Sequence, residues 1–218
     1  MREPLRIELV TPPAITLLLS SEVKAQLNIA DDVIDDDALI LGYIISGIET
    51  CEKFTGRSLI NRTYNLFLDN WPSDRSKEPW WDGVREGSIS ELTRTKKWIE
   101  LPRPPLQSIT SITSYDDSDV ATVWAASNYF VDTASAPGRV VLRTGASIPT
   151  ITRVANGLQI QFVSGYGESQ NDVPEDLRLG IMQIVAYLYE HRGECTESEA
   201  VNGSGASSRW QMYRMLGI

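Results

Sequence analysis

The spacing of apolar residues changes twice along this chain of 218 residues. Between residues 36 and 55, apolar side chains recur every three or four positions, which is typical of one face of a helix. From about residue 61 to residue 163, short segments instead alternate apolar and polar side chains, as half-buried strands do. Helical spacing returns after residue 172. This order predicts an α+β fold in which an α-helical core carries an inserted, antiparallel β-rich module.

Two N-terminal helices and one long C-terminal helix are predicted to form the helical core. The first is short and amphipathic and spans residues 21–29, and the second spans 36–55 and stops at Gly56. The long third helix begins near Pro174 and stops at Gly193. The second and third helices are expected to pack together, although about 115 residues separate them.

The inserted module is predicted to contain short strands separated by turns. The strands are expected at residues 63–69, 98–101, 109–115, 129–132, 139–143 and 158–163. Residues 70–96 are expected to form a long loop or an irregular hairpin, and residues 1–16 an extended arm. Pro102, Pro104 and Pro105 cannot donate ladder hydrogen bonds, so we expect a rigid extended corner before the third of these strands.

These elements predict four parts of the chain. They are an N-terminal arm with helices of the α core (1–60), a β-rich insertion (61–171), the C-terminal helix of the core (172–195), and a flexible linker with a partner-binding tail (196–218).

The tail combines a Gly/Ser-rich stretch, residues 202–208, with six large apolar side chains. They are Trp210, Met212, Tyr213, Met215, Leu216 and Ile218. Ordering residues 208–218 costs about 10–20 kcal/mol of backbone entropy. Burying the six side chains returns about 9–18 kcal/mol. Because the two terms nearly cancel, we expect the tail to order on a partner; the alternative is that it docks on its own domain.

The negative net charge argues against a protein that binds nucleic acid tightly. The chain carries 29 acidic and 20 basic residues and a net charge of −9, whereas DNA binding depends on a surplus of Lys and Arg. At the N-terminus, the apolar run is too short to span a bilayer and no leader peptide is expected. The two cysteines, Cys51 and Cys195, do not suggest a disulfide.

The residues that catalysis requires are scarce, so no catalytic, cofactor-binding or metal-binding site is predicted. His191 is the sole histidine, which excludes a His-pair metal site and leaves at most one histidine base. Five aspartates lie within residues 31–37, but the glycine and distant glutamate of an EF-hand loop are missing. Helix capping and a solvated face explain this acidic run better.

Tryptophans are frequent around the predicted loop. Trp71, Trp80 and Trp81 either stack on sugars or, as such residues more often do, fill a small core or a protein interface.

Four stretches of the sequence carry a family likeness. They are LVTPPAI with LSSEVKAQLNI, DDALILGYIISGIETCEKFTGRSLI, LPRPPLQSITSIT with YFVDTASAPGRVVL, and QIQFVSGYGESQNDVPEDLRLGIMQIVAYLYEHR. In this order and spacing the chain resembles the head–tail connector, or adaptor, proteins of tailed bacteriophages, which also occur in prophages and gene transfer agents. The likeness spans most of residues 9–192 and is weaker over 70–97 and the tail.

The resemblance implies a structural protein of the virion. Such proteins assemble into a homo-oligomeric ring, typically dodecameric, beneath the portal protein, extend the DNA channel and dock a tail-side stopper or terminator protein. DNA would pass without specific binding, and the acidic balance of this chain suits such a channel. The resemblance also implies that the C-terminal segment, here residues 210–218, inserts into the portal. The location would be the head–tail interface, with the host cytoplasm during assembly and no membrane partner.

Two other functions stay open on sequence grounds. One is a module of a phage tail or baseplate that binds a protein or glycan through the Trp-bearing insertion. The other is an enzyme that uses two facing carboxylates, as a glycosidase does. Long amphipathic helices on both sides of the insertion favour assembly, and the acidic clusters lie at helix starts rather than across a predicted cleft.

Overall fold

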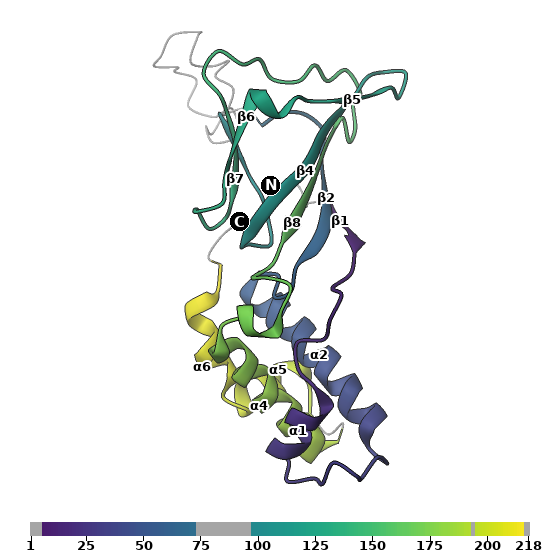
Figure 1. Cartoon of the computed structure of the whole chain (residues 1–218), viewed down its shortest axis with the longest axis vertical. Coiled ribbons are helices and arrows are strands. Elements are labelled where there is room, and N and C mark those ends of the chain that lie inside the picture. The colour runs from purple at the N-terminus through teal and green to yellow at the C-terminus, as the bar shows by residue number, and fades with distance from the viewer. Residues whose placement is uncertain (1–5, 73–96, 193–194, 216–218) are drawn as a thin grey trace, which may run out of the picture. The chain divides into compact units, whose positions relative to one another are not determined.

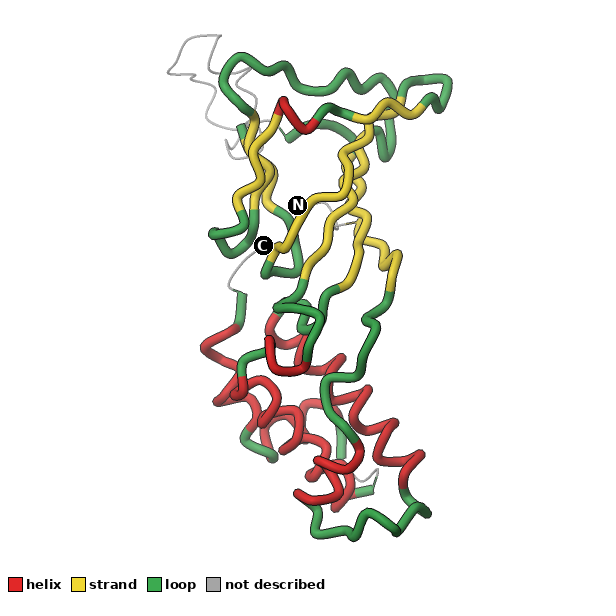
Figure 2. Tube along the Cα trace, viewed as in Figure 1, coloured by secondary structure: helices red, strands yellow, loops and turns green. Residues whose placement is uncertain are grey.

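The computed structural model describes residues 6–72, 97–192 and 195–215, which form two compact units (Figure 1). The β unit comprises the described residues of Met1–Thr11, Thr63–Leu101 and Leu106–Val163. The helical unit comprises those of Pro12–Arg62, Pro102–Pro105 and Ser164–Ile218. The α-helices belong to the second unit, and nearly all strand residues, with the short 3-10 helix η2 (Ala126–Asn128), belong to the first (Figure 2). The predicted α+β class is therefore confirmed.

The helical unit is built from segments at both ends of the chain. Its described α-helices are α1 (Ser20–Gln26), α2 (Asp37–Thr55), α4 (Glu175–His191), α5 (Glu197–Gly203) and α6 (Ala206–Trp210). Two short 3-10 helices also belong to this unit: η3 (Gln170–Asp172) precedes α4, and η4 (Gln211–Tyr213) follows α6. The chain thus leaves this unit after α2 and returns before α4.

The core of the helical unit lies between α2 and α4. Ile40 and Ile44 of α2 and Leu177 and Ile181 of α4 are fully buried in one apolar cluster. Gly47 brings the two helices close together, because a Cβ atom there would lie 3.2 Å from Cγ2 of Ile181. The helical spacing of apolar residues in the sequence corresponds to this buried contact.

The two long helices end in different ways. Gly56 follows α2 with a left-handed backbone (φ 72°), as the sequence predicts. After α4, however, Arg192 takes up the left-handed conformation (φ 36°), one residue before the glycine that was expected to stop the helix. Gly193 itself lies outside the described residues.

Two sheets make up the β unit. The five-stranded sheet has the order β1-β2-β8-β4-β5 and the three-stranded sheet the order β3-β7-β6. The strands are β1 (Arg6–Thr11), β2 (Arg62–Leu68), β3 (Trp98–Glu100), β4 (Leu106–Tyr115), β5 (Ala121–Val123), β6 (Tyr129–Asp132), β7 (Arg139–Leu142) and β8 (Leu158–Ser164). The pairs β1–β2, β4–β5, β3–β7 and β6–β7 are antiparallel.

Alternation places every second residue of the central strand β8 in the core. Leu158, Ile160 and Phe162 are fully buried, in agreement with the pattern LQIQF. Trp71 also belongs to this core, where its ring meets that of Trp124 edge-on at 5.3 Å between centroids. Trp71 is thus a core residue rather than a sugar platform, and Trp80 and Trp81 lie outside the described residues.

The structure differs from the sequence prediction at the first and the shortest strands. Residues 6–11 were expected to belong to an extended arm but form the edge strand β1. Long-range contacts of Arg6 fix this strand, since its guanidinium donates to Asp69 at 2.7 Å and to Asn156 at 2.8 Å. The three exposed residues of β5 were not predicted, and they pair only with the end of β4.

The proline corner fixes the chain where β4 begins. β4 starts at Leu106, immediately after the prolines and three residues earlier than predicted. The carbonyl oxygen of Pro104 accepts from the Ser58 amide at 3.2 Å, and that of Pro105 accepts from the Gly165 amide at 2.9 Å. The prolines thus act as acceptors although they have no amide hydrogen to donate.

The close contact between α2 and α4 leads to a prediction about the two interior glycines of α2. We expect Gly47→Leu to lower the free energy of unfolding by about 1–3 kcal/mol, because the side chain would overpack the contact with α4. Gly42 faces open space, so Gly42→Ala should raise that free energy by about 0.5–1 kcal/mol. Urea denaturation of both variants measures the difference, and equal effects would contradict the assigned contact.

Candidate functional site

The C-terminal segment was predicted to be a flexible linker followed by a loose tail, but its described residues are mostly helical. Residues 197–203 form α5 and residues 206–210 form α6, and η4 follows directly. Thr196 caps α5, because its hydroxyl accepts from the Glu199 amide while the Glu199 carboxylate accepts from the Thr196 amide. Gly205 supplies the left-handed residue (φ 78°) between the two helices.

Trp210 anchors this segment in its own helical unit. Its side chain is fully buried, and its indole N–H donates to the Leu177 carbonyl at 3.3 Å. Gly180 leaves the space that the ring occupies, since a Cβ atom there would lie 2.2 Å from the indole nitrogen. The Phe54 ring lies 5.8 Å away between centroids. Of the six predicted partner-binding residues, Trp210 therefore does not present its side chain to a partner in this structure.

The residues after Trp210 run beside the end of α2. The Arg57 guanidinium donates to the Tyr213 carbonyl at 2.7 Å, and the Met215 amide donates to the Thr55 carbonyl at 2.9 Å. The side chains of Tyr213 and Met215 are half-buried. These contacts hold the chain in place up to residue 215.

Met212 is the member of the predicted set that faces solvent. Its side chain is 89% exposed, although the segment on both sides of it is anchored. Leu216 and Ile218 lie outside the described residues. The structure thus separates the predicted set into a buried anchor, two half-buried residues and one exposed apolar side chain.

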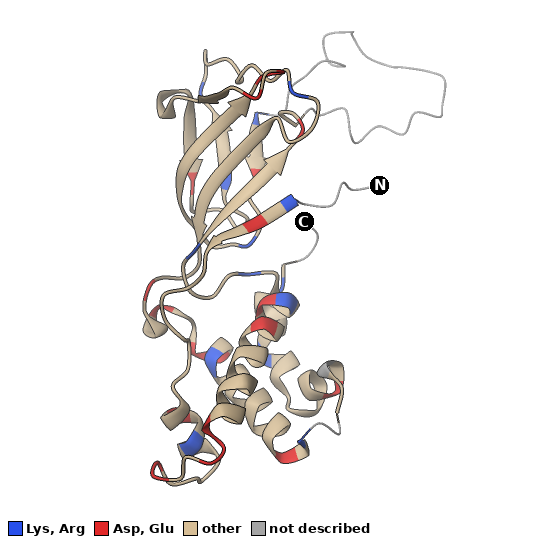
Figure 3. Ribbon diagram, turned by 90° about the vertical axis from the view of Figure 1, so that its right-hand side faces the viewer, with Lys and Arg blue, Asp and Glu red and all other residues tan. Residues whose placement is uncertain are grey.

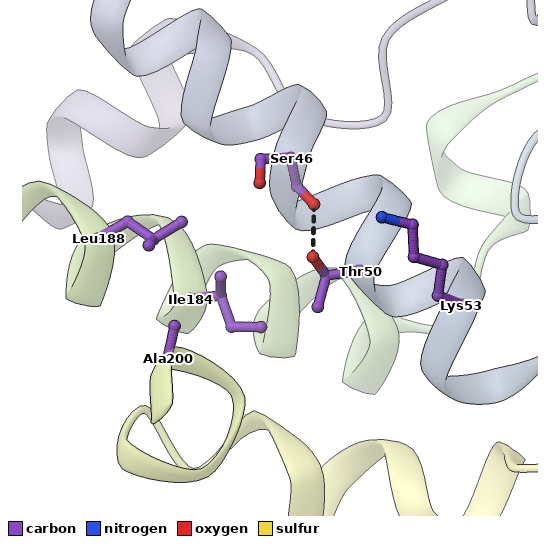
Figure 4. Close-up of a pocket in the computed structure, with 6 residues that line it drawn as sticks. All are labelled: Ser46, Thr50, Lys53, Ile184, Leu188 and Ala200. Atoms are coloured by element: carbon purple, nitrogen blue, oxygen red, sulfur yellow. Dashed lines mark hydrogen bonds between the residues drawn. The ribbon is translucent and has the colours of Figure 1, made fainter. Parts of the chain in front are cut away.

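A groove runs between α2, α4 and α5 of the same unit (Figure 4). One part has a volume of about 250 Å³ and is lined by Ser46, Thr50, Lys53, Ile184, Leu188 and Ala200. The adjoining part has a volume of about 370 Å³ and is lined by Thr50, Lys53, Phe54, Ser198, Val201 and Asn202. The two parts share Thr50 and Lys53, so we treat them as one feature, the helical groove.

The acidic run was expected to cap α2, but its side chains have other partners. Lys24 is buried, donates to the Val33 carbonyl at 2.8 Å and forms an ion pair with Asp37. Asp36 accepts from the Tyr189 hydroxyl at 2.5 Å and from Arg192 at 3.0 Å. The hydrogen bond from Tyr189, and then the charge of Arg192, lower the pKa of the Asp36 carboxyl. The sequence analysis missed the role of Lys24. The signal that points to it is a lysine in a short amphipathic helix that is followed by five aspartates.

Among the described residues, no cluster of three or more potential metal ligands occurs. The His191 ring stacks on Tyr187, and its Nδ1 atom lies 2.8 Å from the Tyr187 carbonyl. Burial raises the pKa of the Cys51 thiol far above its usual value, so this thiol stays protonated.

Comparison with protein families gives a match in the N-terminal part of the chain. The model of the family described as "Phage gp6-like head-tail connector protein" matches residues 20–87. This segment is therefore similar to proteins of the head–tail connector family. The matched range contains α1, α2 and β2, and it confirms the resemblance found in the sequence.

Solved structures extend the likeness to nearly the whole chain. A chain from the neck of an empty gene transfer agent particle, computed with C6 symmetry, has a TM-score of 0.72 and 23% identity over 97% of this chain and 96% of its own. A chain from a native particle neck computed with C12 symmetry has a TM-score of 0.68 and 24% identity over the same shares. A chain of the native virion gives 0.69 and 22%, over 98% of this chain and 97% of its own. At these identities the likeness establishes the fold.

Two further results are negative. No curated protein matches the sequence significantly. Among the described residues, no helix is both long enough and apolar enough to cross a membrane.

Trp210 and Met212 of the C-terminal segment should differ sharply in their effect on stability. Trp210→Ala empties a buried site and removes a hydrogen bond, so it should lower the free energy of unfolding by about 3–5 kcal/mol. Met212→Ala should change it by less than about 0.5 kcal/mol. Thermal or urea denaturation measures both. A small effect of Trp210→Ala would contradict its role as the anchor.

Proposed function

We propose that the chain is a structural connector in the neck of a tailed-phage-like particle. It forms a homo-oligomeric ring beneath the portal protein, extends the DNA channel and docks the next tail-side protein, a stopper or a tail terminator. The observation that carries this proposal is the fold shared with a neck chain over 97% of the present chain, together with the connector family match at residues 20–87. The role needs binding surfaces and no catalytic group.

A ring of twelve copies is the assembly that we propose. The related neck was computed with C12 symmetry, which supports twelve equivalent positions for a chain of this fold. Each copy in a cyclic ring contacts its two neighbours through two different surfaces. The chain functions within the virion at the head–tail interface and is present in the host cytoplasm during assembly.

The C-terminal segment is the proposed contact with the portal. Trp210 and the backbone contacts of Tyr213 and Met215 fix the path of the segment on the helical unit. This leaves Met212, and with it the last residues Leu216 and Ile218, as the apolar side chains proposed to meet the portal. Because the anchor is already ordered, binding would cost less conformational entropy than a loose tail requires.

DNA is proposed to pass through the ring without specific binding. The net charge of −9 disfavours tight contact with phosphates. A conduit that releases DNA during ejection benefits from weak contacts along its wall.

Binding to portal rings of the same particle tests this function. We expect the purified chain to bind them, and Met212→Asp to weaken binding at least about tenfold, since a charge replaces an exposed apolar contact. Val154→Asp is the matched control, because Val154 is 90% exposed and belongs to the β unit. Surface plasmon resonance with immobilised portal rings gives the affinities.

The two possible failures distinguish the connector role of the chain from the contact assigned to Met212. Failure of the wild-type chain to bind portal rings would contradict the connector role. Binding of Met212→Asp with wild-type affinity would contradict only the part assigned to Met212.

A further inference from the structure

The loop between α1 and α2 exposes two neighbouring apolar side chains. Val33 is 46% exposed and Ile34 is 70% exposed. Asp31, Asp32 and Asp35 lie on both sides of this pair and are exposed as well, and the loop is largely acidic in Figure 3. We call residues 31–35, with the sequence DDVID, the DDVID loop. It combines the two kinds of contact, apolar and charged, through which proteins recognise one another.

A buried lysine holds the DDVID loop in place. Lys24, which is only 4% exposed, donates to the carbonyl oxygens of Asp31 (3.4 Å) and Val33 (2.8 Å) and pairs with Asp37 at the start of α2. Burying an ammonium group costs free energy unless such partners compensate for the lost water. The loop backbone is thereby ordered, while the apolar pair faces solvent. A loop that is already ordered loses little entropy when a partner binds it.

The DDVID loop and the proposed portal contact lie at opposite ends of α2. The loop precedes Asp37, the first residue of α2. The C-terminal segment contacts the last residue, because the Met215 amide donates to the Thr55 carbonyl at 2.9 Å. With 19 residues at about 1.5 Å each, α2 is about 28 Å long. Two different proteins can therefore bind at Met212 and at the DDVID loop at the same time.

Charge limits what can bind the DDVID loop. Its three carboxylates form no ion pair among the described residues, so they repel the phosphates of nucleic acids and of anionic lipids. Two such loops facing each other would bring like charges together. The helical groove of another copy offers no surface for the apolar pair, since its lining residues Ile184 and Val201 are buried. The loop therefore fits a different protein, one with an apolar pocket bordered by Lys or Arg.

We propose that the DDVID loop docks the tail-side protein, which receives the apolar pair in a pocket bordered by Lys or Arg. This assignment rests on the proposed function, in which the chain binds the portal on one side and a tail-side protein on the other. The portal contact is assigned to the C-terminal segment, so the loop at the far end of α2 is left for the second partner. The segment that meets the tail-side protein and the chemistry of that contact are thereby added to the function.

A double variant of the apolar pair tests the contact. Val33→Ser with Ile34→Ser removes exposed apolar surface and leaves Lys24 and the loop backbone unchanged. The matched control is Val123→Ser with Val154→Ser, which makes the same change on exposed residues of the β unit. Circular dichroism checks that both variants fold.

A second double variant tests the charge. Asp31→Asn with Asp32→Asn removes two carboxylates on one side of the apolar pair. The matched control is Asp117→Asn with Glu168→Gln, which neutralises two exposed carboxylates elsewhere on the chain.

Surface plasmon resonance measures both contacts in turn. Portal rings of the same particle are immobilised and saturated with the chain, and the purified tail-side protein is then passed over them. We expect the apolar variant to bind the portal as wild type does and to bind the tail-side protein at least about tenfold more weakly. The charge variant should associate with the tail-side protein at least about threefold more slowly at low salt, and this difference should shrink at high salt. Both controls should match wild type.

Three results would overturn the proposal. They are unchanged tail-side affinity of the apolar variant, equal association rates of the charge variant and wild type at low salt, and a loss of portal binding in the apolar variant. The connector role is decided separately by the wild-type chain. If wild type binds the portal and the tail-side protein and the loop variants do so equally well, the role stands and this contact is wrong. If wild type binds the portal but not the tail-side protein, the docking role itself is contradicted.

Discussion

The buried contact between α2 and α4 is the interaction on which the rest of the structure depends. It joins segments on both sides of the strands, so the chain leaves the helical unit, builds the β unit and returns to complete the helical core. Gly47 permits the close approach of the two helices. Gly180 of α4 leaves the space into which the Trp210 ring packs. The C-terminal segment and the helical groove both rest on α4. Loss of this contact would therefore disrupt both the C-terminal segment and the helical groove.

The sequence predicts those features that depend on local periodicity. The helix at 36–55, the strand pattern of LQIQF and the α+β class all follow from the spacing of apolar residues. Features that depend on distant partners do not. The role of Arg6 in fixing β1 needs Asp69 and Asn156, and the burial of Trp210 needs the space above Gly180. Treating the six apolar residues of the tail as one set missed that a single glycine gives one of them a place in the core.

The helical unit carries the surface that we propose meets the portal. Met212 is exposed on an anchored segment, and Val33 and Ile34 are exposed on a loop that Lys24 holds. In both places ordered backbone presents apolar side chains to solvent, which favours a partner over a solvated surface.

The most direct test of the central claim is electron microscopy of particles produced without this chain. Deleting its gene from the producing host should leave DNA-filled heads and separate tails that do not join, and supplying the wild-type chain in trans should restore tailed particles. Tailed particles of normal number and appearance in the deletion strain would contradict the account, because a connector between head and tail cannot be dispensable for joining them.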